Sequence, residues 1–236
     1  MRKTILICLA LFTVALTGEA QDLLRHVISF NFGFGANIAD HRVRNTVNKY
    51  QMEEDIEPED LAGDRHGVLN LEYHYCLNKH WAIGGMMGWG RSRESYIGFD
   101  ETSKPEGASK WYESRGNETS KIFYVAPSVK YTWLNWRDDW AHTYSFYSRC
   151  AVGVMRQHVT FDFSEGTVWN DAKTGHYQSD IKKNPDKCTD ETKWKPTLQL
   201  TPIGFEIRKR HFGYFAEVGY GCQGVVAIGL RYAFGH

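Results

Sequence analysis

Hydrophobic and small or polar residues alternate along several segments of this chain. The clearest is residues 225–236 (VVAIGLRYAFGH), where apolar side chains occupy every second position from Val226 to Phe234 and Ala, Gly and Arg231 fall between them. Successive side chains of a strand point to opposite faces. This segment is therefore predicted to be a strand with one apolar face and one small or charged face.

Seven further segments show the same period of two, which predicts eight strands in all. Within the fifth segment the alternation is lost from Arg156 onward, and in the sixth it changes phase at Pro202, where a β-bulge is expected. The seven segments are residues 28–35, 68–75, 81–90, 122–133, 144–161, 198–208 and 212–220.

The connections between these segments alternate in length. Residues 76–80, 134–143 and 209–211 form short turns, whereas about thirty residues separate the first and second, third and fourth, and fifth and sixth segments. The last connection, residues 221–224, is a tight hairpin. Short turns on one side and long loops on the other are typical of an eight-stranded antiparallel up-and-down transmembrane β-barrel with three long extracellular loops and both termini in the periplasm.

Aromatic side chains gather near the predicted short turns, where Trp and Tyr settle at a lipid–water interface. A soluble sandwich with a second covering sheet is one alternative. A soluble lipocalin-like carrier of an apolar ligand is another, and it would place the apolar residues inside the barrel. The aromatic residues near the turns are Tyr75, Trp81, Trp133, Trp136, Trp140, Tyr144, Phe212, Tyr232 and Phe234.

The first twenty residues have the pattern of a secretory signal peptide. Arg2 and Lys3 precede an apolar run of twelve residues, and small residues lie near Ala20. We therefore expect residues 1–20 to be a signal peptide and residues 21–236 to be one barrel domain. The remaining 216 residues (236 minus 20) carry 26 Lys and Arg against 27 Asp and Glu, which gives no reason to expect nucleic-acid binding. They contain no apolar run of 18 residues, so no transmembrane helix is expected.

The eight alternating segments, the signal peptide and the closing residues 229–234 (GLRYAF) resemble the small outer-membrane β-barrel proteins of the OmpA/OmpX-like superfamily. The resemblance is architectural and covers essentially the whole mature chain. It implies the outer membrane of a Gram-negative bacterium, contact with membrane lipids and lipopolysaccharide, and insertion by the barrel-assembly machinery. Members often end on an aromatic residue, whereas here Gly235 and His236 follow Phe234.

An eight-stranded barrel is just wide enough for side chains to fill it. Several charged residues, together with His74, fall on the inward face, and we expect them to form an ion-pair network that plugs the lumen. Across the last hairpin, Glu217 and Arg231 are expected to lie opposite each other or one diagonal apart. A proton or ion path through the lumen is the alternative. The charged residues expected in the network are Glu72, Lys130, Arg149, Glu206, Arg208, Glu217 and Arg231.

The loops carry the expected structural or surface-binding role, for a partner that the sequence does not name. Six carboxylates between residues 53 and 60 form either a solvated acidic face or a cation site, without the spacing of an EF-hand. The loop at about residues 164–195 is rich in lysine, and the opposite charges of the two loops could either meet each other or bind lipopolysaccharide phosphates. No cofactor is expected.

Enzymatic activity is not expected, although a lipid-modifying enzyme of the same fold remains an alternative. The candidate groups for such an enzyme are His66 beside Asp64, and His158 with Ser92 or Ser95, and no motif links them.

Four cysteines remain after removal of the signal peptide, in a compartment that permits disulfides. A bridge between Cys188 and Cys222 is possible because both fall on the loop side. Cys76 and Cys150 are expected to be free thiols.

Overall fold

The computed structural model describes residues 24–35, 62–99, 110–170 and 177–235. The expected signal peptide and the acidic run at residues 53–60 lie outside the described residues, so both remain sequence predictions. No described helix is long and apolar enough to cross a membrane.

Eight long strands form a closed antiparallel ring in the described part of the chain. Each strand pairs with its neighbours in sequence, and β1 closes the ring by pairing with β10, with Phe30 opposite Leu230. The prediction of an eight-stranded up-and-down barrel is therefore confirmed. The strands are β1 His26–Phe34, β2 Ala62–Cys76, β3 Trp81–Phe99, β4 Lys110–Arg137, β5 His142–Asn170, β8 Thr189–Lys209, β9 Phe212–Gly221 and β10 Val226–Phe234.

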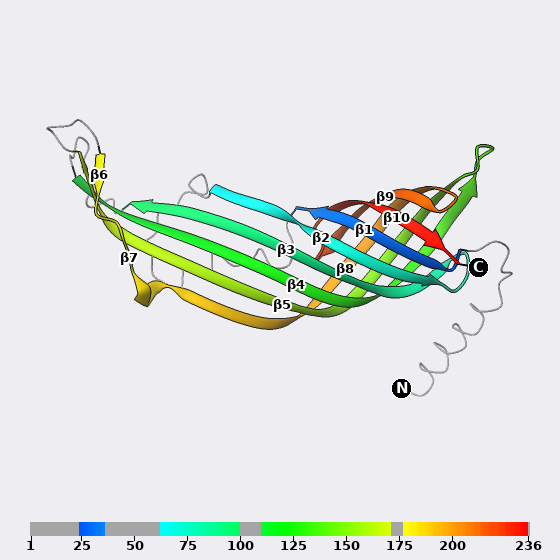
Figure 1. Cartoon of the computed structure of the whole chain (residues 1–236), viewed down its shortest axis with the longest axis horizontal. Helices are drawn as coiled ribbons and strands as arrows, with labels where there is room; N and C mark the ends of the chain where they lie inside the picture. Colours follow the sequence, from blue (N-terminus) through cyan, green and yellow to red (C-terminus); the bar gives the residue numbers. More distant parts are fainter. Residues whose placement is uncertain (1–23, 36–61, 100–109, 171–176, 236) are drawn as a thin grey trace.

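Four of these strands continue well beyond the barrel and form a projecting sheet (Figure 1). β3, β4, β5 and β8 have 19, 28, 29 and 21 residues, against 9 in β1. Short elements pair with or follow the far part of β5: β6 Tyr177–Ser179, β7 Lys182–Lys183 and the 3₁₀ helix η3 Pro185–Lys187. Much of what the sequence predicted as the second and third long loops is thus strand.

The fifth strand, predicted over residues 144–161, continues through the loss of alternation at Arg156 and extends to Asn170. Burial continues to alternate along β5, with Gln157, Val159 and Phe161 buried. Beyond the apolar surface, outward positions no longer need to be hydrophobic. The hydrophobic pattern therefore disappears while the ladder of backbone hydrogen bonds continues.

The bulge expected at Pro202 is confirmed. The register between β8 and β9 shifts between Leu200 and Ile203, and the register between β5 and β8 shifts between Tyr147 and Arg149. The Ser148 hydroxyl donates a hydrogen bond to the Pro202 carbonyl oxygen at 2.6 Å. The extra residue allows apolar side chains to face outward on both sides of the bulge, which explains the change of phase.

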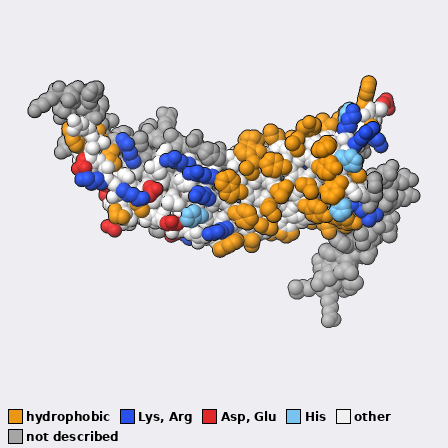
Figure 2. Space-filling view, in the orientation of Figure 1, with side chains coloured by type: hydrophobic (Ala, Val, Ile, Leu, Met, Phe, Trp, Pro, Cys, Tyr) orange, Lys and Arg blue, Asp and Glu red, His pale blue; other side chains and the backbone are white. Residues whose placement is uncertain are grey.

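Burial in the barrel is inverted relative to a soluble protein. Outward side chains are apolar and exposed, such as Phe30 at 53% and Leu230 at 55%, whereas Glu72 and Arg231 in the lumen are 1% and 2% exposed. Figure 2 shows the apolar side chains as a broad belt around the barrel half of the molecule. An exposed belt of this size is typical of a surface that faces lipid. Both soluble alternatives require these residues to be covered, so the structure argues against them.

Aromatic side chains mark both borders of this belt. At the turn end, the rings of Trp81 and Tyr131 lie 4.7 Å apart and those of Phe212 and Tyr232 lie 4.8 Å apart. At the other border, Trp89 is opposite Phe123 on the outer face. From residue 81 to residue 89 the strand rises about 26 Å, or about 20 Å of height at a tilt of roughly 40°, which is close to the apolar band of outer-membrane barrels.

Candidate functional site: charged residues in the lumen

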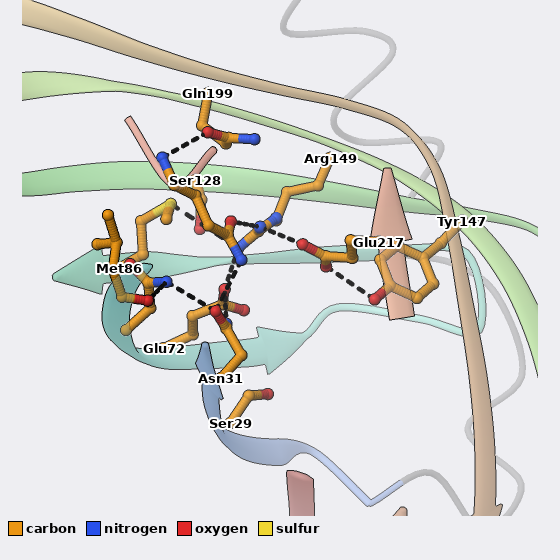
Figure 3. Close-up of polar contacts among 12 residues, drawn as sticks. Ser29, Asn31, Glu72, Met86, Ser128, Tyr147, Arg149, Gln199 and Glu217 are labelled. Atoms are coloured by element: carbon orange, nitrogen blue, oxygen red, sulfur yellow. Dashed lines mark hydrogen bonds and ion pairs between the residues drawn. The ribbon is translucent and has the colours of Figure 1, made fainter. Parts of the chain in front are cut away.

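The centre of the lumen is occupied by Arg149, which β5 directs inward. Its guanidinium forms ion pairs with Glu72 of β2 and Glu217 of β9, and all three side chains are nearly inaccessible to solvent. The Tyr147 hydroxyl donates to Glu217 Oε1 at 2.8 Å. Figure 3 shows Arg149 between the two carboxylates. Three strands are therefore linked through one guanidinium, whose planar donors suit two carboxylates at once.

A second cluster lies closer to the turns and is centred on Glu206 of β8. Glu206 forms ion pairs with Arg231 of β10 and with Lys130 of β4, the latter at 3.0 Å. Arg231 Nε also donates to Ser29 Oγ at 2.8 Å, and its guanidinium lies 4.2 Å from the centre of the Phe215 ring. The cluster ties β10 to β8, β4 and β1.

The predicted partnership of Glu217 and Arg231 across the last hairpin is wrong in register. Arg231 is opposite Gly213, and Glu217 is opposite Ala227, so the two residues are offset by four positions. They approach only to 4.0 Å, between Arg231 Nη2 and Glu217 Oε1. The main partner of Arg231 is Glu206 and that of Glu217 is Arg149, because side chains reach across the lumen more readily than along the wall.

The two clusters together are electrically balanced. Three cations (Lys130, Arg149 and Arg231) meet three carboxylates (Glu72, Glu206 and Glu217). The structure thus brings together six of the seven predicted residues. The seventh, Arg208, is half-buried at the turn end and is absent from the ion pairs of the described residues. Removing charges from water is costly unless they are paired, and each of these six has a partner of opposite charge, although Glu72 Oε2 and Arg149 Nε have no hydrogen-bond partner among the described residues.

Amide side chains extend the hydrogen-bond network of the lumen beyond the ion pairs of Arg149. Asn31 donates to Glu72 at 2.8 Å, Asn70 donates to Asn31 at 2.7 Å, and Gln223 donates to the same oxygen of Asn31 at 2.7 Å. The Tyr124 hydroxyl donates to Asn70. Sequence reasoning assigned no role to these residues. Alternation places Asn31 and Asn70 inward, but Gln223 lies in the final hairpin and no pattern indicates that its side chain turns into the lumen.

Glycines make room for the long side chains of the lumen. A Cβ atom at Gly88 of β3 would lie 2.4 Å from Asn70 Oδ1, and one at Gly204 of β8 would lie 2.4 Å from the Tyr147 ring. The absence of a Cβ at Gly88 therefore leaves space for the inward side chains of Asn70 and Tyr124. At the turn end a cavity of about 60 Å³ remains, lined by Lys130, Glu206 and Arg208 among others.

The structure does not assemble the catalytic groups considered from the sequence. On the inward face, Ser92 of β3 is opposite Ser120 of β4, which is opposite Val159 of β5. His158 lies on the outward face, opposite Lys121. His158 instead contacts Thr192 Oγ1 at 3.0 Å.

Ser95 is the second possible partner of His158. In the strand register His158 is opposite Lys121, which in turn is opposite Arg91 of β3. Ser95 lies four residues farther along β3 than Arg91. The side chains of Asp64 and His66 lie outside the described part of the structure. Among the described residues, no group of three or more His, Cys, Asp or Glu side chains could hold a metal ion.

The possible Cys188–Cys222 bridge is not formed, because both cysteines are free, as are Cys76 and Cys150. Cys188 lies beside η3, with its Sγ 3.2 Å from the Asn184 carbonyl oxygen. Cys222 is buried at the start of the last hairpin.

At the turn between β4 and β5, Asp138 accepts hydrogen bonds that stabilise the turn. The His142 backbone N–H donates to it at 2.8 Å and the Tyr144 hydroxyl donates at 3.0 Å. Slight burial favours the neutral acid, but these hydrogen bonds outweigh it and lower the pKa of the Asp138 carboxyl below its usual value.

A closed eight-stranded ring, apolar outside and charged inside, defines the class of outer-membrane β-barrel proteins. No protein-family model matches this chain, and a search of curated proteins finds no match. Two crystal structures of Ail, the attachment invasion locus protein of Yersinia pestis, are similar to it, with 12% and 13% identity and TM-scores of 0.31 and 0.28. The alignments cover 88% of this chain and 92% and 91% of those chains, and the first structure is a complex with the heparin analogue sucrose octasulfate.

At such low identity and TM-score, the assignment of this chain to the class rests on its own ring, belt and lumen.

Proposed function

We propose that this chain is an integral protein of the outer membrane of a Gram-negative bacterium and that it acts through the surface it exposes beyond the membrane. The observation that carries the proposal is the charge-balanced lumen inside a ring with a lipid-facing belt. A filled lumen leaves no open path for a solute. The projecting sheet and the loops beyond it are then the parts available for a structural or binding role.

The proposed orientation places the short turns and both ends of the chain in the periplasm. In its support, the β2–β3, β4–β5 and β8–β9 turns lie at the end of the barrel opposite the projecting sheet (Figure 1). Short periplasmic turns and larger extracellular parts are usual for this class.

The proposed partners are lipids and lipopolysaccharide of the outer membrane, the barrel-assembly machinery during insertion, and an extracellular partner that is not identified. We propose no enzymatic activity, since the described candidate groups do not converge. We likewise propose no cofactor.

Labelling of intact cells tests the orientation. Single cysteines placed at Lys183 in the projecting sheet and at Asn78 in the β2–β3 turn, in a chain without its other cysteines, should react differently with an impermeant maleimide. Only the residue 183 variant should be labelled, and disruption of the outer membrane should expose residue 78. Equal labelling of both in intact cells would contradict the topology.

Planar-bilayer recording tests the plug. The refolded chain should show no steady conductance, because the lumen is filled. A stable open channel in the parent protein would contradict the proposal.

Mass spectrometry of the mature protein tests the predicted removal of the signal peptide, after which Gln21 should be the first residue.

The extracellular partner can be sought by testing the protein for binding to a panel of soluble ligands. Ail was crystallised with a heparin analogue, so sulfated saccharides are one class to include among extracellular matrix and serum components.

A further inference from the structure

The cavity of about 60 Å³ at the turn end of the lumen is large enough to hold a small ligand. A buried water needs about 10 to 15 Å³, so the cavity has room for several waters or for one small polyatomic ion. Residues 78–80 of the β2–β3 turn form part of its lining, and Lys79 is exposed, so the cavity reaches the end of the barrel. In the proposed orientation that end faces the periplasm.

The charged lining of this cavity is unbalanced in favour of cations. Glu206 is the only carboxylate among the described residues that line it. Lys130 and Arg231 both donate to the same oxygen of Glu206, Oε2. The lining also includes Arg208 and Lys79. Four cations therefore line a cavity that has one carboxylate.

Arg208 is the lumen cation that has no carboxylate partner. The other charged residues of the two clusters are all in ion pairs, whereas Arg208 forms none among the described residues. It is half-buried on β8, two residues from Glu206 and on the same face. Its guanidinium presents planar pairs of N–H donors, which match two oxygens of an oxyanion. A charge that is partly removed from water gains from a counter-charge, and an anion in the cavity would supply one.

A buried ring nitrogen without a partner is a second, independent observation at this cavity. His74 of β2 lines the cavity and is 2% exposed. Its Nε2 lies 2.9 Å from Ser128 Oγ, but its Nδ1 has no hydrogen-bond partner among the described residues. Leaving a buried polar atom unpaired is destabilising. When the Ser128 hydroxyl donates to Nε2, Nδ1 carries the ring proton, and a bound anion can accept it.

The available donors decide the kind of ligand. Arginine and lysine only donate, so the group that they bind must accept hydrogen bonds. A metal ion needs a different set of ligands, and no group of three His, Cys, Asp or Glu side chains in the described part of the chain could hold one. Water accepts hydrogen bonds but does not neutralise Arg208. An oxyanion does both.

We propose that the turn-end cavity binds a small oxyanion, a phosphate or carboxylate group, with Arg208 as its main ligand and Lys130 and His74 as further donors. Lys130 donates to Glu206 through one of its three N–H groups, so others remain for the anion. The site is separate from the loops and the projecting sheet of the proposed function. Only the side from which the anion enters depends on the proposed orientation.

Binding of inorganic phosphate to the full mature chain, refolded in detergent micelles, tests the site. In a titration at constant ionic strength, the NMR signal of the Arg208 Nε–H group should shift and saturate. Line broadening of the phosphate phosphorus signal gives the affinity of each variant. Arg208→Gln should weaken binding by roughly tenfold or more, because a hydrogen bond to a charged group is worth about that factor. The control Lys209→Gln removes the same charge from the next, exposed residue and should leave the affinity unchanged.

Two further variants test the chemistry of the site, with protease resistance of the barrel as the check that each is folded. Arg208→Lys keeps the charge but loses the planar donors, so its affinity should fall between those of the parent and Arg208→Gln. Glu206→Gln removes the carboxylate that competes for Lys130, so phosphate should bind several-fold more tightly than to the parent. Weaker binding to a folded Glu206→Gln variant would contradict the site.

Other anions separate the sources of the oxyanion. Acetate should compete with phosphate, whereas chloride should compete poorly, because it has the charge but not the paired oxygens. Competition by glycerol phosphate would assign the site to the end group of a larger solute, and competition by inorganic phosphate and acetate alone would assign it to a free ion; either result supports the site. An unmoved Arg208 signal, equal binding to the parent and Arg208→Gln, or equal competition by chloride would overturn it.

Discussion

Arg149 of β5 and Glu217 of β9 form a buried ion pair across the lumen, although β8 lies between their strands in the wall. The same guanidinium pairs with Glu72 of β2, so one side chain holds two carboxylates from distant parts of the sequence. Removing the shared cation and removing one of its partners should therefore have unequal effects.

Arg149→Leu leaves Glu72 and Glu217 buried together without their cation and should reduce the free energy of unfolding by about 3 to 5 kcal/mol or more. Glu217→Leu leaves Arg149 paired with Glu72 and should cost clearly less. Urea unfolding of the barrel in lipid vesicles measures both values. A larger loss for Glu217→Leu would show that Arg149 is not the centre of the network.

At two neighbouring residues of β10, gaining a charge at one and losing a charge at the other should each lower the stability of the barrel. Leu230→Arg places a charge in the lipid-facing belt and should cost up to about 2 to 4 kcal/mol near the bilayer midplane. Arg231→Leu removes a cation from the lumen and leaves Glu206 with Lys130 alone. A double-mutant cycle should find Arg231 coupled more strongly to Glu206 than to Glu217, and the reverse order would mean that the ion pairs are misassigned.

Two glycines provide a matched pair of tests for the packing of the lumen. Gly204→Ala forces the Tyr147 ring away and should cost about 1 to 3 kcal/mol. At Gly85 an added Cβ meets only the Ala126 carbonyl oxygen, at an ordinary 3.6 Å, so Gly85→Ala should change stability by less than about 0.5 kcal/mol. Equal effects on the urea midpoint would argue against a filled lumen around Tyr147.

Asp138 should make the β4–β5 turn sensitive to pH. Its pKa is lowered in the folded state, so its stabilisation is present above the unfolded pKa of about 3.9 and is lost as the pH falls through the folded value. Asp138→Asn should lower the urea midpoint at neutral pH, and the difference from the parent should shrink below about pH 4. Asp139→Asn, one residue along the turn, is the control. A difference independent of pH would contradict this role.

Much of the barrel could be predicted because lipid imposes a pattern on the sequence. Where one face of a strand meets lipid and the other a packed lumen, apolar and polar residues must alternate, as in β10. The same logic placed Glu72, Arg149 and Arg231 inside. Beyond the belt the constraint ends, and the far parts of β4 and β5 could not be recognised as strands although their pairing continues from Lys121 and His158 to Lys110 and Trp169.

The partners within the lumen could not be predicted for a different reason. Alternation gives the face of a residue but not its height, and height depends on the stagger of strands around the ring. Glu217 and Arg231 therefore appeared to be neighbours, while the structure pairs Arg231 with Glu206 on the next strand but one. Gln223 shows a further limit, because its contact with Asn31 joins residues 192 positions apart through a turn that carries no alternation.

The depth of Cys150 in a bilayer tests the central claim most directly. This residue is a free, exposed cysteine on the outer face of β5, within the belt and next to the inward Arg149. After replacement of Cys76, Cys188 and Cys222 by alanine, a fluorophore on Cys150 should be quenched most by nitroxide groups midway along the lipid acyl chains. A fluorophore at Lys121→Cys, beyond the belt, should be quenched most by nitroxides at the headgroup. Quenching of the Cys150 fluorophore by aqueous iodide, with no preference for acyl-chain nitroxides, would contradict a lipid-facing belt and the membrane barrel built on it.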